Sequence, residues 1–498
     1  MRYFLGIDNG GTSTKASVYD ERGRELVTAA ATTNAIYPAP GFAERDMEEM
    51  WRTNCRVIRE AVEHSGLCGK DISAVAVCGH GKGLYLWGKD GRGARRAILS
   101  ADNRATAVLK RLQREGLEEK LFPLTLQHMM ACQPAQLLIW LREHEPQTVE
   151  NIRWIFSCKD YLRFRLTGCA AFEKTDASGS GLINLNSADY DGEILSLLGL
   201  SELRYALPPL KNADEVCGCI TTEAARLTGL EPGTPVAGGM FDIDACALAV
   251  GAVEPDRLCM IAGTWSINEY PIARPILDGS VRMNSLFCIP GTYLAEDSSP
   301  TSAGNLEWYI RSFFADRKEN GAQESIYDVL SRLALSVPPG EDCPVFVPYL
   351  NGGARNGAAR GGFFGLSSSH TRAHLTRAVY EGIAMGHRFH MEELKKSNSS
   401  WSRICLSGGA ARSPFWAQMF ADVMQMPVEA AKINECGTLG CAMAAAVACG
   451  VYPSLREASE AMRPSPVSYA PNSELAGYYD REYARYLRCL SFAEQDWI

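Results

Sequence analysis

The feature that most constrains the fold is a strand, turn and strand unit that opens the chain and returns near its middle. In the first unit, an apolar run ends in Asp8 and is followed by a turn of glycines and hydroxyl residues. Gly263-Thr264 forms the corresponding turn of the second unit. Short apolar runs separated by such turns predict β-hairpins, with the strands Tyr3–Asp8, Lys15–Tyr19, Leu258–Ala262 and Trp265–Tyr270. The repetition predicts a duplicated α/β architecture in which each half presents one small-residue turn to a shared cleft.

The chain of 498 residues is too long for one compact core, because domains cluster at roughly 100 to 200 residues. We place the boundary near Gly251, which gives domains over residues 1–250 and 251–498. Helical spacing of apolar residues predicts a helix at Met47–His64. The alanine-rich run around Met443 is too short to cross a membrane and predicts a buried helix.

Composition excludes several classes of function. The formal net charge of −8 leaves no cationic surface for a nucleic-acid backbone or an anionic membrane. No stretch approaches the roughly 20 apolar residues of a membrane-spanning helix, and the apolar run before Asp8 is too short for a signal peptide. The 17 cysteines follow no disulfide framework, which favours reduced thiols and a cytoplasmic location.

The turn after the first strand has the chemistry of a phosphate-binding loop. Residues 6–15 read GIDNGGTSTK. Glycines let backbone N–H groups approach an anion closely, hydroxyls donate hydrogen bonds, Lys15 adds positive charge, and Asp8 can hold Mg²⁺ directly or through water. A glycine-rich hairpin without a ligand has the same pattern, so these residues alone leave both interpretations open.

The segment GIDNGGTSTK resembles the first phosphate-binding hairpin of carbohydrate kinases in the actin, hexokinase and Hsp70 superfamily. Residues 361–382, GGFFGLSSSHTRAHLTRAVYEG, resemble the C-terminal signature of the FGGY family of these kinases. The resemblance implies two ribonuclease H-like α/β domains that flank a central cleft, and phosphorylation of a sugar by ATP with Mg²⁺. It also implies that the N-terminal domain binds the sugar and the C-terminal domain binds the adenosine.

Further segments resemble the nucleotide site of this family. Residues 263–266, GTWS, look like the second phosphate hairpin, and residues 406–413, LSGGAARS, look like the adenosine-binding strand, turn and helix. Two glycines after an apolar strand permit close backbone approach to a ribose or phosphate, and a packing role is the alternative. The resemblance implies contacts to ATP and Mg²⁺ from Asp8, Gly11, Thr12, Ser13, Lys15, Gly263, Thr264, Gly408, Gly409, Ala410 and Ser413, with Asp8 at the metal.

Residues 238–242, GGMFD, resemble the segment that carries the catalytic aspartate of the family, which makes Asp242 the matching general base. A carboxylate at a helix N-terminus stays ionised through the helix dipole and nearby N–H donors, and it can accept a proton from a sugar hydroxyl. The alternative for Asp242 is an N-cap residue. Asp244 is a rival base, although its position inside the following helix would point it elsewhere.

Sugar contacts are expected from the first half of the chain, at positions where the family holds substrate hydroxyls: His80, Lys82, Asp102, Arg104 and Asp242. Asp102 is the best single candidate, because a carboxylate can accept two hydroxyl hydrogen bonds and an unpaired buried acceptor rejects a wrong epimer. For Lys82 and Arg104, an ordinary surface or salt-bridged cation is the alternative.

The stretches GFAERDMEEMW, AILSADNRA and SPTSAGNLEWY resemble the L-xylulose kinases within the family. They imply transfer of the γ-phosphoryl group of ATP to a ketopentose, L-xylulose, to give the 5-phosphate. Two alternatives remain: a family kinase for D-xylulose, ribulose, erythritol or glycerol, and a non-catalytic nucleotide-dependent binding protein on the same fold. A homodimer is the expected assembly, since two-fold dimers are the commonest oligomers.

Overall fold

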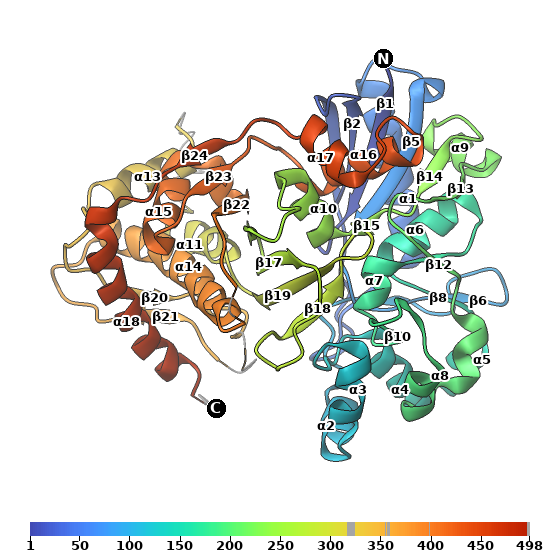
Figure 1. Cartoon of the computed structure of the whole chain (residues 1–498), viewed down its shortest axis with the longest axis horizontal. Helices are drawn as coiled ribbons and strands as arrows, with labels where there is room; N and C mark the ends of the chain where they lie inside the picture. Colours follow the sequence, from blue (N-terminus) through green and yellow to red (C-terminus); the bar gives the residue numbers. More distant parts are fainter. Residues whose placement is uncertain (316–323, 354, 356–358, 398, 496–498) are drawn as a thin grey trace. The chain divides into compact units, whose positions relative to one another are not determined.

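The computed structural model describes residues 1–315, 324–353, 355, 359–397 and 399–495. The chain folds into two compact units (Figure 1). The first comprises Met1–Val253, Pro271–Leu294 and Ile433–Pro464, and the second comprises Glu254–Tyr270, Ala295–Lys432 and Ser465–Ile498. The two-domain α/β fold is confirmed, but the units are not simply the two halves of the chain. The functional division into residues 1–250 and 251–498 stays a prediction.

The sheet of the first unit has the strand order β13-β14-β5-β1-β2-β3, with β15 beside the end of β5. β1 and β2 form the antiparallel hairpin expected at the start of the chain, and β5 runs parallel to β1 on its other side. The strands are β1 Tyr3–Asn9, β2 Ser13–Asp20, β3 Glu25–Thr32, β5 Ile72–Gly79, β13 Val216–Cys219, β14 Pro235–Ala237 and β15 Met240–Phe241.

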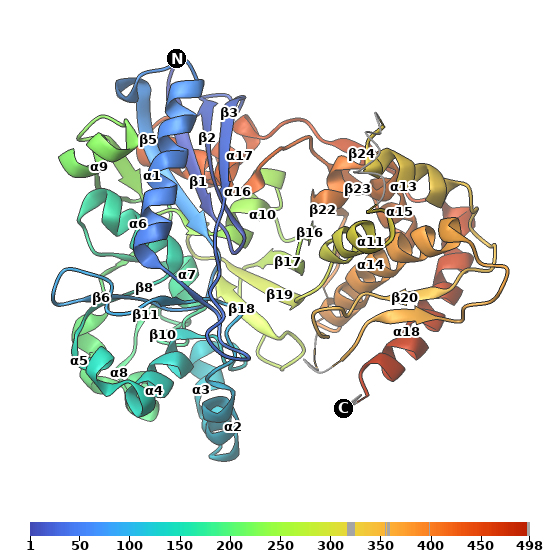
Figure 2. The ribbon, with the colours of Figure 1, turned by 180° about the vertical axis from the view of Figure 1, so that it is seen from behind.

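Helices cover both faces of this sheet. α1 (Met47–His64) has the expected bounds, and it begins where the Asp46 side chain accepts hydrogen bonds from two N–H groups of the first turn. α1 lies in front of the sheet in Figure 2, and α16 (Cys436–Ala448), the alanine-rich run, lies in front of it in Figure 1. Thr14 and Ser17, which point to opposite faces of β2, contact α1 and α16 respectively.

Glycines bring α16 into backbone contact with its neighbours. A Cβ at Gly6 of β1 would lie 1.8 Å from the carbonyl oxygen of Thr438, and a Cβ at Gly440 would lie 2.3 Å from that of Ala245. Ala245 belongs to α10 (Asp242–Val250), which packs along α16. Because these contacts join main chains directly, they leave little room for the start of α10 to move relative to β1.

The rest of the first unit consists of short helices and hairpins around a core of leucine and isoleucine side chains. These elements are β4 Glu44–Arg45, β6 Tyr85–Gly88, β7 Ala97–Ile98, α2 Thr106–Arg114, α3 Leu117–Thr125, α4 Pro134–His144, α5 Pro146–Glu150, β8 Ile152–Phe156, α6 Cys158–Thr167, β9 Phe172–Glu173, α7 Lys174–Ser178, β10 Ile183–Asn184, β11 Asp189–Tyr190, α8 Gly192–Leu197, β12 Leu210–Lys211, α9 Thr222–Thr228, β18 Met283–Leu286 and α17 Leu455–Met462.

The second large sheet has the order β18-β19-β17-β16-β22-β23-β24. β16 and β17 form the second expected hairpin, and β22 runs parallel to β16, so the arrangement of β1, β2 and β5 is repeated. The elements are β16 Arg257–Ala262, β17 Ser266–Ile272, β19 Tyr293–Ser299, α11 Gly304–Phe313, α13 Ile326–Leu335, β20 Val345–Val347, β21 Gly362–Phe364, α14 Arg372–Lys395, β22 Arg403–Gly408, α15 Pro414–Met424, β23 Val428–Ala430, β24 Val467–Tyr469 and α18 Ala476–Ala493.

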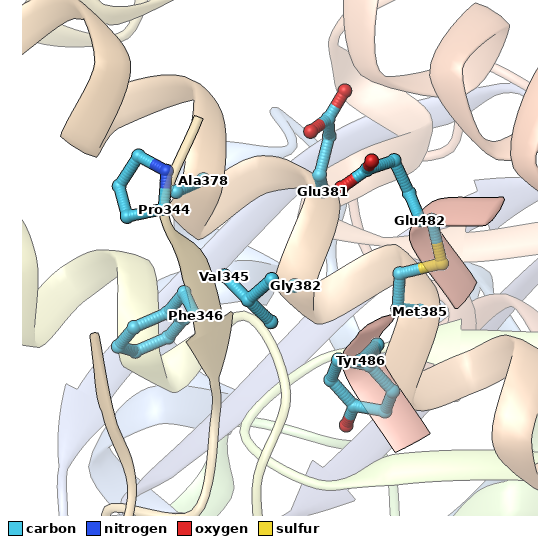
Figure 3. A pocket seen from close by; sticks show the side chains of 9 residues that line it. All are labelled: Pro344, Val345, Phe346, Ala378, Glu381, Gly382, Met385, Glu482 and Tyr486. Carbon is cyan, nitrogen blue, oxygen red and sulfur yellow. The ribbon is translucent and has the colours of Figure 1, made fainter. Parts of the chain in front are cut away.

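A small cavity lies between β20, α14 and α18 of the second unit. Phe346, Met385 and Tyr486 are among the side chains that line it (Figure 3). Its volume of about 20 Å³ is room for roughly one water molecule. The cavity is therefore a gap in packing and cannot hold a sugar or a nucleotide.

Composition predicted that no helix spans a membrane and that the cysteines are reduced. None of the helices in the described residues combines the length and the apolar character needed to cross a bilayer. The 17 cysteines are present as free thiols, which agrees with the absence of a disulfide framework in their spacing.

Candidate functional site

The carboxyl ends of three neighbouring parallel strands bring polar residues together in the first unit. Asp8 of β1 pairs with Cys78 of β5, which in turn pairs with Met240 of β15. The residues that follow at this edge are His80 after β5 and Asp242 after β15. In open α/β sheets, ligands bind outside the carboxyl ends of the strands. The edge that carries Asp8, His80 and Asp242 is therefore the candidate site of this unit.

Asp8 has the surroundings of a cation ligand. Its Oδ1 atom is buried without a hydrogen-bond partner, and burial raises the pKa of the carboxyl group to about 6 although Lys15 is near. In the described residues, no group of three His, Cys, Asp or Glu side chains could hold a metal by itself. Mg²⁺ usually takes one or two carboxylates together with phosphate oxygens and water. The residues present fit a magnesium ion that is bound together with a nucleotide.

Asp242 is the first residue of α10, and its side chain is half-buried. The N-cap position belongs to Phe241, so the capping alternative for Asp242 is wrong. Burial and repulsion by Asp8 and Asp176 raise the pKa of Asp242 well above its ordinary value, while the Ile243 N–H group opposes the rise. Burial and the neighbouring carboxylates therefore oppose the ionisation that was expected from the position of Asp242 at a helix terminus.

Asp244 has different surroundings. Its side chain is fully buried, and its Oδ1 accepts a hydrogen bond from the Cys288 N–H group at 2.9 Å. Burial raises the pKa of Asp244 well above its ordinary value. A carboxyl group enclosed in this way is held by the protein interior, which supports Asp242 rather than Asp244 as the candidate base.

A buried cluster of charges lies close to Asp242 and was not predicted from the sequence. Its members are Lys159, Asp160, Arg163, Glu173 and Asp176. The Lys159 ammonium lies 3.0, 3.2 and 3.4 Å from the three carboxylates of the cluster. Thr175, inside the same segment, accepts a hydrogen bond from the Phe241 N–H group at 2.8 Å. The cluster therefore supports the residue that precedes Asp242. Charged residues at helical spacing usually indicate a solvent-exposed helix face, so the sequence did not predict that this cluster is buried.

The turn of the first hairpin is open. Gly11 and Thr12 are exposed, Ser13 is half-buried, and a Cβ at Gly11 would meet no atom within 4 Å. The Lys15 ammonium lies 2.5 Å from a carboxylate oxygen of Glu435, so its charge is already paired. Arg45 of β4, within the stretch GFAERDMEEMW, donates hydrogen bonds to carbonyl groups of the turn, a contact that the sequence did not predict.

His80 and Lys82 follow β5 at the candidate edge. The His80 Nε2 atom lies 2.9 Å from the Tyr85 hydroxyl, and burial lowers the pKa of the ring to about 3, so it is neutral. Lys82 is half-buried, has a φ of 59°, and places its ammonium 5.7 Å from the centre of the Phe241 ring. A positive φ outside glycine is uncommon and clusters at functional sites. Lys82 thus lies near Asp242, and contacts of His80 and Lys82 to a sugar stay predictions.

Asp102 and Arg104 form a closed pair inside the first unit. Asp102 Oδ2 lies 2.8 Å from the Arg104 guanidinium and accepts the Ala43 N–H group at 2.6 Å, and Oδ1 accepts two further bonds from Arg104. Arg104 also pairs with Glu44 at 2.8 Å. Both oxygens of Asp102 are thus occupied, and Arg104 has the salt-bridged role considered as its alternative. Sugar binding by either residue stays a prediction.

In the second unit, β16 and β22 are parallel, and Ala262 pairs with Gly408 at their carboxyl ends. The hairpin turn of Gly263 and Thr264 therefore begins beside the LSGG segment. Gly408 has a φ of 81°, and a Cβ there would lie 2.4 Å from the Ala262 carbonyl oxygen, so glycine is required. The structure thus brings together the two segments expected to bind the nucleotide in this unit.

The remaining nucleotide-binding candidates follow Gly408 and differ in their surroundings. Gly409 is exposed, whereas Ala410 is buried. The Ser413 hydroxyl accepts the Trp416 N–H group at 3.3 Å and caps α15. The main chain at Gly409 is open to a ligand, and Ser413 already has a structural partner. Contacts of these residues to adenosine stay predictions.

His387 of α14 anchors the second hairpin, and no pattern in the sequence pointed to it. Its Nδ1 lies 2.8 Å from Asn268 Oδ1, and its Nε2 lies 2.8 Å from the Ser302 hydroxyl. Burial lowers the pKa of His387 to about 3, so the neutral ring donates through Nδ1–H and accepts at Nε2. The Ser302 N–H group in turn donates to the Thr264 carbonyl at 3.1 Å.

Comparison with known proteins covers nearly the whole chain. Models of the N-terminal and C-terminal domains of the FGGY family of carbohydrate kinases match residues 3–249 and 258–449. The L-xylulose/3-keto-L-gulonate kinase of Escherichia coli (strain K12) is 36% identical over 97% of this chain and 96% of its own. The probable L-xylulose kinase of Pasteurella multocida (strain Pm70) is 34% identical over 98% of each. The crystal structure of ligand-bound xylulose kinase from Lactobacillus acidophilus has a TM-score of 0.88 and 25% identity over 99% of this chain and 98% of its own. The chain therefore belongs to the FGGY family of carbohydrate kinases and is an ATP-dependent sugar kinase.

Proposed function

We propose that this kinase phosphorylates L-xylulose at its terminal hydroxyl and gives ADP and L-xylulose 5-phosphate, with Mg²⁺ as the metal. Similarity over almost the full chain to two proteins named as L-xylulose kinases supports the choice of sugar. The free cysteine thiols support a reducing compartment, the cytoplasm, as its location. A homodimer is the expected assembly.

Asp242 is the general base of this proposal. It accepts the proton of the sugar hydroxyl as the hydroxyl oxygen attacks the γ-phosphorus of ATP. A raised pKa makes the ionised Asp242 carboxylate a stronger proton acceptor than an ordinary aspartate. The observation that carries the proposal is the half-buried Asp242 carboxylate on the same strand edge as Asp8, while Asp244 is enclosed.

Nucleotide binding is assigned to both hairpins. Asp8 would hold magnesium, and the ion when bound would supply positive charge to the phosphates of ATP. The open turn at Gly11, Thr12 and Ser13 orients the transferring phosphoryl group, and so does the turn at Gly263 and Thr264. Backbone groups at Gly408, Gly409 and Ala410 approach the adenosine. Catalysis then depends mainly on orientation and on charge stabilisation.

A keto sugar acid is a second candidate substrate. The name of the Escherichia coli relative includes 3-keto-L-gulonate. Lys82 lies near Asp242, and it forms no salt bridge with a carboxylate in the part of the chain that the structure describes. An ammonium group in this position can pair with the carboxylate of a sugar acid. We expect Lys82→Met to lower activity on the acid more than on L-xylulose.

The test is ADP release with Mg·ATP across L-xylulose, D-xylulose, L-ribulose, D-ribulose, erythritol, glycerol and 3-keto-L-gulonate. L-xylulose should give the largest kcat/KM, and another dominant substrate would replace it in the proposal. Asp242→Asn serves as the blank and should lower kcat by about 10² to 10⁴ without weakening ATP binding. An active Asp242→Asn enzyme would remove Asp242 as the base.

A further inference from the structure

Arg45 is a buried cation with no carboxylate partner among the residues that the structure describes. Its side chain lies in β4 with an exposed fraction of only 2% for the residue. The neighbouring carboxylates are engaged elsewhere: Glu44 binds Arg95 and Arg104, and Asp46 caps α1. Across the residues that the structure describes, Arg45 forms no salt bridge. A buried guanidinium without a counter-ion is costly, which points to an anion that the protein itself does not supply.

The other groups around Arg45 are neutral. Burial, together with the Arg45 charge, lowers the pKa of His80 to about 3. Burial raises the pKa of Tyr85 well above its ordinary value, and it raises the pKa of the Cys158 thiol to about 11. None of these three groups carries a compensating negative charge at neutral pH.

The hydrogen bonds of Arg45 connect it to the first phosphate hairpin. Its guanidinium donates to the carbonyl oxygens of Gly10 at 3.2 Å and Gly11 at 2.5 Å, and to the Thr33 hydroxyl at 2.9 Å. Its Nε atom is buried and has no partner. The cation therefore lies directly behind the open turn.

The other two carbonyl oxygens of the turn also accept hydrogen bonds from the protein. The Thr12 carbonyl accepts the Thr33 N–H group, and the Ser13 carbonyl accepts the Gly10 N–H group, both at 3.0 Å. Together with the two bonds from Arg45, the carbonyl oxygens of all four residues 10–13 are occupied within the protein. Carbonyl oxygens repel a phosphate, so engaging all four leaves the donors of the turn to meet the ligand.

Lys15 is paired with Glu435, whereas Arg45 forms no salt bridge within the described residues. We infer that Arg45 is the positioning and charge-balancing residue of the first hairpin. It holds the carbonyl oxygens of the turn away from the ligand, and the phosphates of ATP are its counter-ion. The inference rests on the proposed nucleotide role of this hairpin.

The experiment measures binding of ATP and of adenosine to the intact enzyme by calorimetry, and thermal unfolding without ligand. Arg45→Gln removes the charge, Arg45→Lys keeps it, and Arg56→Gln removes an exposed arginine from α1 as the matched control. We expect Arg45→Gln to weaken ATP binding at least about tenfold and to leave adenosine binding within about twofold. Arg45→Lys should retain more of the ATP affinity, and Arg56→Gln should change neither affinity.

Stability separates this role from a purely structural one. Removing an unbalanced buried charge should leave the Tm of the free Arg45→Gln enzyme unchanged or raise it. A lower Tm with unchanged ATP affinity would overturn the inference, and so would equal weakening of ATP and adenosine. If the unmodified enzyme binds adenosine as tightly as ATP, the phosphate role of the hairpin fails and the inference fails with it. A normal ATP preference with an unaffected Arg45→Gln enzyme refutes the inference alone.

Discussion

Replacing Gly440 with alanine tests whether the packing of α16 on α10 holds the candidate base in place. The new Cβ would lie 2.3 Å from the Ala245 carbonyl oxygen and 2.7 Å from its Cα, whereas ordinary contact begins at 3.4 Å. The two helices must therefore separate by about 1 Å. Overpacking of this kind costs roughly 1–3 kcal/mol of unfolding free energy. Because Asp242 begins α10 and a displacement of about 1 Å can cost 10²-fold in rate, we expect kcat to fall by roughly ten- to a hundredfold.

The assay combines thermal unfolding with steady-state kinetics on the best sugar. The Tm of Gly440→Ala should fall by roughly 2–12 °C. Gly477→Ala in α18 is the matched control, because the nearest atom to its new Cβ is 3.7 Å away. There the same substitution should add about 0.5–1 kcal/mol of stability by reducing the freedom of the unfolded chain. A Gly440→Ala enzyme with unchanged Tm and kcat would refute the reasoning, and a lower Tm with normal kcat would limit α16 to a stabilising role.

The surroundings of three residues, Asp244, Asp8 and His387, lead to four further expected outcomes. Asp244→Asn should keep kcat within about threefold, because burial already favours the neutral acid that asparagine mimics; a loss as large as that of Asp242→Asn would make Asp244 the base. With a pKa of about 6, Asp8 should bind Mg·ATP more tightly as pH rises from about 5 to about 7, in titrations at constant salt, and Asp8→Asn should abolish this dependence. In the protein without ligand, Asp8 binds its proton more tightly in the folded state than in the unfolded state. The free energy of unfolding in urea should therefore fall as pH rises from about 5 to about 7. His387→Asn should raise KM for ATP about tenfold and leave KM for the sugar unchanged, because the second hairpin loses its anchor through Ser302; equal changes in both would contradict this.

Local chemistry accounts for the parts of the fold that the sequence predicted. Both hairpins are confirmed because alternating apolar strands and small-residue turns are encoded within a few neighbouring residues. The helix Met47–His64 has its predicted bounds because Asp46 caps its first turn. The alanine-rich run is a buried helix as expected, since only small side chains allow main chains to approach so closely.

Long-range pairing accounts for what the sequence did not predict. Lys15 was expected to neutralise phosphate, yet it pairs with Glu435, which lies 420 residues further along the chain. Asp102 was the favoured sugar ligand, yet its oxygens are taken by Arg104 and by the main chain at Ala43. The periodicity of a sequence does not predict which carboxylate forms an ion pair with which cation. Arg45 is the opposite case, because within the described residues it has hydrogen-bond partners but no carboxylate partner.

The position of α16 has a consequence for synthesis of the protein. The strand that contains Ile7 leaves the ribosome before the helix that covers one of its faces, and Cys441 of that helix follows 434 residues later. While the residues between them are synthesised, the nascent chain therefore carries an uncovered apolar strand face, the kind of surface that chaperones bind. A premature stop anywhere between residues 254 and 432 leaves the first unit incomplete. Such truncated products should be cleared by proteases rather than accumulate as folded N-terminal halves.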